Sequence, residues 1–112
     1  MKVIRIAFIS AVTLGLIFTF AFASDEAEKG KALFNDPTFA GGVKACSSCH
    51  PKGEGLEEAG DKKEFHNMGE TQASLEEAIN ICIVYAIKGK AIDVKSDQMK
   101  AMVAYIKSLK AK

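Results

Sequence analysis

The sequence lacks several features that would indicate common classes of protein. No stretch alternates apolar and polar residues as a half-buried β-strand does, so an all-α protein is predicted. There is no internal repeat, and 15 lysines and arginines are balanced by 14 acidic residues, so nucleic acid is not an expected partner. Only three cysteines occur among the 112 residues, and Cys82 lies far from the other two. An odd, isolated cysteine needs its own explanation.

Residues 1–23 have the three-part layout of a secretory signal peptide. Two basic residues precede an apolar run over residues 6–22, and Ala21 and Ala23 are small residues at the expected cleavage positions. An uncleaved membrane anchor is the alternative, because the run is about long enough to cross a bilayer. Acidic residues soon after Ala23 favour cleavage, so we expect export to the periplasm and one mature domain, residues 24–112.

Three helices are predicted in the mature chain, over residues 24–36, over residues 74–89, and from Ser96 onward. Ser96 caps the third helix, and its inner face carries a methionine at 99 and another at 102. Between the first two helices the sequence is rich in glycine and has no long apolar period. Such a segment needs something other than side-chain packing to organise it.

The helix predicted over residues 74–89 is apolar on nearly all sides and must be largely buried. Ser74 is its expected cap, Glu77 completes a capping box, and Gly89 follows its end. One stripe with the spacing of a helix face contains Leu75, Ile79, Cys82 and Ala86.

The segment KACSSCHPKGEG contains the motif C-x-x-C-H, formed by Cys46, Cys49 and His50. A redox dithiol would need neighbouring strands that the sequence does not offer. A zinc site would have to recruit Cys82 and His66 as well. In the third interpretation both thiols add to the vinyl groups of a haem, and the adjacent histidine binds the iron from below.

Covalent haem explains the most features of the sequence. The motif is specific for this attachment, which occurs in the oxidising compartment to which the signal peptide leads. A haem also supplies apolar surface that so small a domain lacks. We therefore predict one haem c, with thioether bonds to Cys46 and Cys49 and with His50 as the proximal iron ligand.

The chain resembles the class I cytochromes c. GKALFND is similar to their first helix, CSSCH to their haem attachment site, and MKAMVAYIKSL to their last helix. The resemblance implies a small all-α cytochrome c fold in which three main helices and a glycine-rich loop wrap one covalently bound haem. It also implies that Gly30 packs closely against Tyr105, and that single electrons pass between redox partner proteins.

The second iron ligand departs from the class I pattern, because the loop KGKAIDVKS contains no methionine. Met99 and Met102 fall inside the last helix and Met68 lies in an earlier loop, so all three are weaker candidates. Bis-histidine ligation through His66 is a further alternative.

The C-terminal part, from EEAINICIVYAIKGK to the last helix, resembles the haem domains of SoxA and thiosulfate dehydrogenase. There a cysteine thiolate can be the distal iron ligand, and the matching position here is Cys82. Plain packing in the core and a disulfide between two chains are the alternatives for this residue.

The expected function is that of an exported monohaem electron carrier, not an enzyme. Lysines outnumber acids after Ile79, which provides a possible docking face for redox partner proteins, including a membrane-associated donor or acceptor. The alternative is a haem subunit of an enzyme that oxidises a sulfur compound such as thiosulfate. A haem sensor that binds a small ligand is the third hypothesis.

Overall fold

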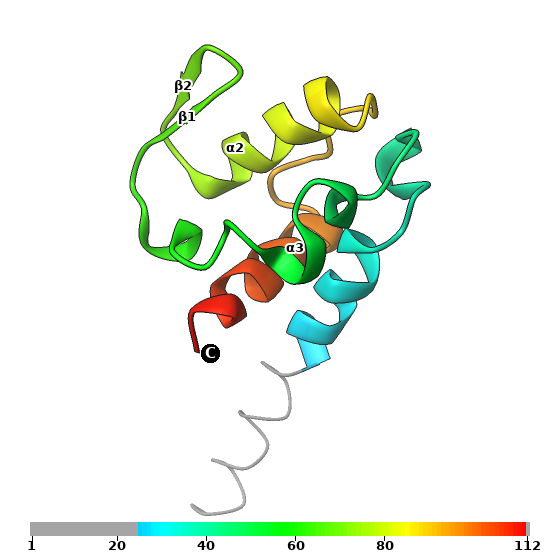
Figure 1. Ribbon diagram of the computed structural model, residues 1–112, viewed down its shortest axis with the longest axis horizontal. Helices are drawn as coiled ribbons and strands as arrows, with labels where there is room; N and C mark the ends of the chain where they lie inside the picture. Colours follow the sequence, from blue (N-terminus) through cyan, green and yellow to red (C-terminus); the bar gives the residue numbers. More distant parts are fainter. Residues whose placement is uncertain (1–24, 112) are drawn as a thin grey trace, which may run out of the picture.

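Helices from the two ends of the domain cross each other, and the rest of the chain lies around them (Figure 1). In the computed structural model, which describes residues 25–111, the first helix covers residues 25–34 and α3 covers Asp97–Ser108. Between them in sequence, α2 (Leu75–Ile81) packs against α3. None of the described helices has the length and apolar character needed to cross a membrane. The predicted signal peptide, residues 1–23, lies outside the described residues.

Gly30 brings the first helix into direct contact with α3. A Cβ atom on Gly30 would lie 1.9 Å from the backbone oxygen of Ala101 and 2.7 Å from the Cβ of Tyr105. Beside this contact, the rings of Phe34 and Tyr105 have centroids 5.2 Å apart. The close packing of Gly30 against Tyr105 is therefore confirmed.

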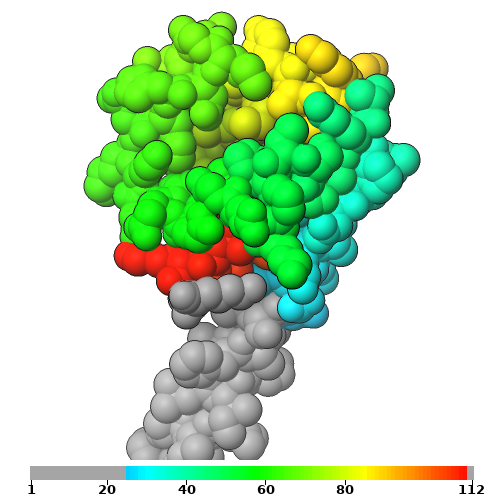
Figure 2. Space-filling model, viewed as in Figure 1, coloured from blue at the N-terminus to red at the C-terminus, as the bar shows by residue number. Residues whose placement is uncertain are grey.

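The glycine-rich middle of the chain folds into a series of short 3₁₀ turns. These are η1 (Phe39–Gly41), η2 (Cys46–Ser48), η3 (Pro51–Gly53) and η4 (Ala59–Asp61). The last of them packs on α3, where a Cβ on Gly60 would lie 2.9 Å from the Cγ of Lys107. Figure 2 shows this middle segment covering one face of the molecule, in front of α3.

Two short strands correct the prediction of a purely helical fold. β1 (Phe65–Asn67) pairs antiparallel with β2 (Glu70–Gln72). The two turn residues, Met68 and Gly69, have φ angles of 54° and 78°, as a type I′ hairpin turn requires. Three residues per strand are too few to produce a recognisable alternation, and for this reason the sequence pattern did not reveal the hairpin.

The predicted start of α2 is confirmed with one difference in its capping box. The Oγ of Ser74 accepts a hydrogen bond from the Glu77 N–H at 3.1 Å. The Glu77 carboxylate accepts from the Ala73 N–H at 3.0 Å, instead of from Ser74. The Ser96 cap of α3 is also confirmed, since its Oγ accepts from the Met99 N–H at 3.1 Å.

The helix that begins with α2 changes character at Cys82. Residues Cys82–Ala86 form η5, a π-helical segment in which the Ile87 N–H donates to the Cys82 carbonyl at 3.2 Å. The left-handed residue after its end is Lys88, with φ 61°, and Gly89 follows just past the helix as predicted. Gly89 is required for a different reason, because a Cβ there would lie 2.7 Å from the Ala40 oxygen.

The side of this helix that is most buried differs from the predicted stripe. The fully buried positions are Ala78, Ile79, Ile83 and Ile87. Of the other predicted positions, Leu75 and Cys82 are half-buried. Both line a cavity next to the core. The predicted stripe therefore marks the edge between the core and this cavity.

Asn80 holds the segment before α3 in place with two hydrogen bonds. Its Nδ2 donates to the Ile92 carbonyl at 2.8 Å, and its Oδ1 accepts from the Ile92 N–H at 2.9 Å. Replacing Asn80 with alanine leaves both partly buried backbone groups unpaired, so we expect the free energy of unfolding to fall by about 2 kcal/mol. Chemical denaturation measures this. The control is Asn35→Ala, which removes one exposed local bond; an equal effect of both variants would contradict the expectation.

Candidate functional site

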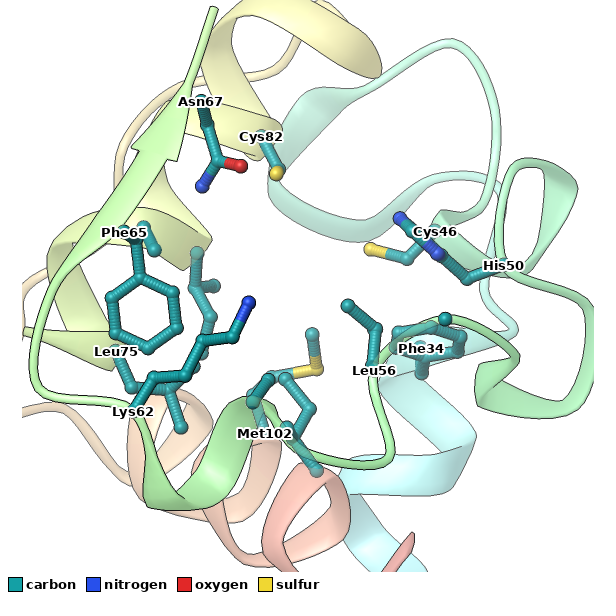
Figure 3. Close-up of a pocket in the computed structure, with 15 residues that line it drawn as sticks. Phe34, Cys46, His50, Leu56, Lys62, Phe65, Asn67, Leu75, Cys82 and Met102 are labelled. Atoms are coloured by element: carbon teal, nitrogen blue, oxygen red, sulfur yellow. The ribbon is translucent and has the colours of Figure 1, made fainter. Parts of the chain in front are cut away.

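An apolar cavity lies where the first helix, the middle segment, the hairpin, α2 and α3 meet (Figure 3). Its volume is about 230 Å³, many times what one water needs. Most of its wall is carbon, from residues that include Phe34, Leu56, Phe65, Leu75, Ile79 and Met102. Six of the lining side chains carry nitrogen, oxygen or sulfur, namely Cys46, His50, Lys62, Asn67, Cys82 and Met102. A large apolar ligand with a few polar attachments suits such a wall.

His50 lines this cavity, and one hydrogen bond fixes the tautomer of its neutral ring. Its Nδ1 lies 2.8 Å from the backbone carbonyl of Glu54. A carbonyl can only accept a hydrogen bond, so Nδ1 carries a proton, and in the neutral ring Nε2 is the nitrogen with the free electron pair. This is the arrangement that a histidine ligand to a metal needs, and Gly55, with φ 91°, follows the carbonyl that fixes it.

The two cysteines of the motif, at the start and the end of the turn η2, differ in exposure. Cys46 is half-buried and lines the cavity, whereas Cys49 is exposed. The Cys46 carbonyl accepts from the N–H groups of Cys49 and His50, both at 3.2 Å. Burial, together with the nearby Cys82, raises the pKa of the Cys46 thiol to about 11. The structure thus brings Cys46, His50 and Cys82 to one cavity, and Cys49 is not among the residues that line it.

Cys82 and Met102 are the two candidate distal ligands that line the cavity. Figure 3 shows the Cys82 sulfur directed into the space from the start of η5. Burial raises the pKa of this thiol, and the charge of Cys49 adds to the effect. Met102 is only 1% exposed.

The other candidate ligands lie elsewhere. Met99 is fully buried but does not line the cavity. Met68 occupies the hairpin turn and is 58% exposed. His66 is exposed on β1, with its Nε2 3.0 Å from a carboxylate oxygen of Glu64 and its Nδ1 3.1 Å from the Thr71 hydroxyl. None of these three side chains faces Cys46 or His50 across the cavity.

The zinc interpretation finds no support in the described part of the chain. Within residues 25–111, no three histidine, cysteine or acidic side chains are grouped so that they could hold a metal ion. The thiol of Cys82 and the ring of His66 therefore do not complete a site with the C-x-x-C pair.

Two polar residues of the cavity wall were missed by the sequence analysis. Lys62 follows η4, and Asn67 ends β1. Figure 3 shows both side chains directed into the cavity. Neither stands in a motif, and a hairpin that the sequence did not predict positions Asn67, so no local pattern could have identified them.

Comparison with known proteins gives one match. The family model described as SoxA/TsdA, cytochrome c domain, matches residues 29–111. No curated protein and no solved structure matches the chain. The matched range contains the C-x-x-C-H motif, the whole cavity wall and Cys82, and extends well beyond the C-terminal part to which the narrower resemblance was assigned.

Proposed function

We propose, because the chain belongs to the SoxA/TsdA cytochrome c domain family, that it carries one haem c and passes single electrons between redox partner proteins. The observation that best supports this is His50, whose free Nε2 stands at the wall of an apolar cavity beside Cys46. When bound, the haem supplies an iron that alternates between the ferric and ferrous states. The protein supplies the attachment, the ligands and an environment of low polarity.

Cys46 and Cys49 would hold the haem through covalent bonds. Each thiol would add across one vinyl group, its sulfur to one carbon and its proton to the other, so the attachment would need no oxidant. His50 would bind the iron through Nε2 while the Glu54 carbonyl keeps its ring in place. The carbon-rich wall would cover the ring and keep water from it.

Cys82 is our proposal for the distal iron ligand. Its side chain lines the cavity and is half-buried. The residue lies at the start of the helical segment η5, and not in a loop. Burial raises the thiol pKa, so the free side chain is protonated at neutral pH, whereas coordination to a metal removes that proton. Thiolate ligation adds negative charge at the iron and favours the ferric state.

We also propose that the protein is exported to the periplasm, because residues 1–23 have the layout of a secretory signal peptide. The excess of lysine after Ile79 suits a redox partner with an acidic surface. Mass spectrometry of protein purified from a host that attaches haem c tests both points. The expected mass is that of residues 24–112 plus one haem, and an intact leader would contradict the cleavage.

The experiment that tests electron transfer is a spectroelectrochemical titration of the haem-loaded protein. We expect a single, reversible one-electron transition. A protein that retains no covalent haem, or that cannot be reoxidised by a redox partner, would overturn the proposal.

A second candidate function is that of a haem subunit in the oxidation of a sulfur compound. The family match and a cysteine sulfur directed into the cavity favour it. Thiosulfate oxidation by the protein, alone or with co-purified partners, tests it. Reduction of the haem by thiosulfate would support the idea, and its absence with every partner would exclude it.

A further inference from the structure

We propose that Lys62 binds the carboxylate groups of the haem, an inference that rests on the proposed function. A haem is apolar across its ring but carries two ionised carboxylates along one edge. These anions need a partner wherever the ring enters an apolar cavity. Among the described residues that line the cavity, Lys62 is the only lysine or arginine.

The position of Lys62 is fixed by the turn that precedes it. Its backbone N–H donates to the carbonyl of Ala59 at 3.3 Å and closes η4. Ala59 is buried, and Asp61 forms an ion pair with Lys110 near the end of the chain. Because η4 packs on α3 and the ion pair ties it to the turn after α3, the Lys62 side chain emerges at the cavity and not at a freely moving loop.

The direction of the side chain agrees with this role. Figure 3 shows the amine of Lys62 turned toward the middle of the cavity. The residue as a whole is exposed, so the cavity is open to solvent where the Lys62 side chain enters it. A haem, which is apolar across its ring and charged along one edge, would suit this opening. The ring would contact the carbon-rich wall, and the charged edge would meet the amine and water.

Among residues 25–111, no carboxylate competes for the amine. No aspartate or glutamate of the described chain lines the cavity, and Lys62 takes part in none of the ion pairs found among residues 25–111. An amine directed at a carbon-rich wall without an acidic neighbour is therefore available to a carboxylate that enters with the ligand.

The electrostatic consequence is a measurable change in electron affinity. Reduction adds one negative charge to the haem, and a nearby cation stabilises that state. Removing the charge of Lys62 therefore makes reduction less favourable. Lys63, the next residue, is exposed and does not line the cavity, so it provides a control with the same change of net charge.

The test compares the haem-loaded variants Lys62→Gln, Lys62→Glu, Lys62→Arg and Lys63→Gln by redox titration. We expect the equilibrium constant for reduction to fall on the order of threefold in Lys62→Gln and tenfold in Lys62→Glu, the latter about 59 mV for one electron. Lys62→Arg and Lys63→Gln should stay at the parent value. The resonance Raman bands of the haem carboxylates respond to hydrogen bonding. They should shift in Lys62→Gln and stay unchanged in Lys63→Gln.

Two results would overturn the proposal. Equal potentials and equal Raman bands in Lys62→Gln and Lys63→Gln would show that Lys62 does not bind the carboxylates. A changed ferric electron paramagnetic resonance spectrum in Lys62→Gln would show that the amine binds the iron instead. In either case reversible reduction of the parent and of Lys63→Gln would leave the proposed electron-carrier function standing.

Discussion

Replacing Gly30 with alanine is expected to lower the free energy of unfolding of the haem-loaded protein by about 3 kcal/mol. The added methyl group would stand 1.9 Å from the Ala101 oxygen, far inside van der Waals contact. The atoms that it meets belong to backbone or to a Cβ, so they cannot move aside as the end of a flexible side chain could. The first helix and α3 would have to separate, and the Phe34–Tyr105 ring contact would loosen with them.

A matched control separates this clash from intrinsic helix propensity. Ala32 is exposed on the same helix, and Ala32→Gly should destabilise the protein by about 1 kcal/mol through propensity alone. Gly30→Ala reverses that chemical change, so propensity alone would make it stabilising. Guanidinium titrations followed by circular dichroism measure both. A Gly30→Ala variant as stable as the parent would show that the two helices do not approach so closely.

The Cys82→Ala variant is expected to lose its distal ligand and to change the ferric electron paramagnetic resonance spectrum from low-spin to high-spin. Loss of the thiolate charge should also raise the reduction potential on the order of 0.1 V, a fraction of the roughly 0.8 V that axial ligands span. Both effects follow from the proposed ligation of the iron by Cys82, which lines the cavity.

Met102→Leu is the control for the loss of a cavity sulfur, because methionine and leucine are similar in volume. Met102 lines the same cavity, and its replacement should leave the spectrum unchanged. Cys82→Met serves where Cys82→Ala binds haem poorly, and it should restore a low-spin iron at a higher potential. Identical spectra for the parent and Cys82→Ala, with a changed spectrum for Met102→Leu, would transfer the ligand role to Met102.

Much of the helical framework could be predicted because its determinants are local. Ser74 and Ser96 cap their helices as expected, each through a hydrogen bond to a backbone N–H three residues later. The contact between Gly30 and Tyr105 followed from the resemblance to cytochromes c, and the structure confirms it. The two serines lie within three residues of the N–H groups that they cap. Gly30 and Tyr105 belong to a pattern that the family shares.

The features that escaped prediction depend on contacts between distant segments. Met68 adopts a left-handed conformation that few methionines do, and the hairpin it closes has no alternating pattern. Gly89 was interpreted as the residue that follows a helix. The structure requires glycine there because any side chain would clash with the backbone oxygen of Ala40, far away in sequence. Lys62 gains its position from the packing of η4 on α3. No window of neighbouring residues contains this information.

The π-helical segment Cys82–Ala86 makes the chain tolerant of one change in length. A π turn contains one residue more than an α turn, so deleting a residue within it would leave an ordinary α-helix. The residues on either side of the deletion would keep about the same orientation, so Gly89 would still face Ala40. In α3, which has no such extra residue, the same deletion would rotate everything after it by about 100°. We therefore expect a single-residue deletion to be tolerated better within Cys82–Ala86 than within α3.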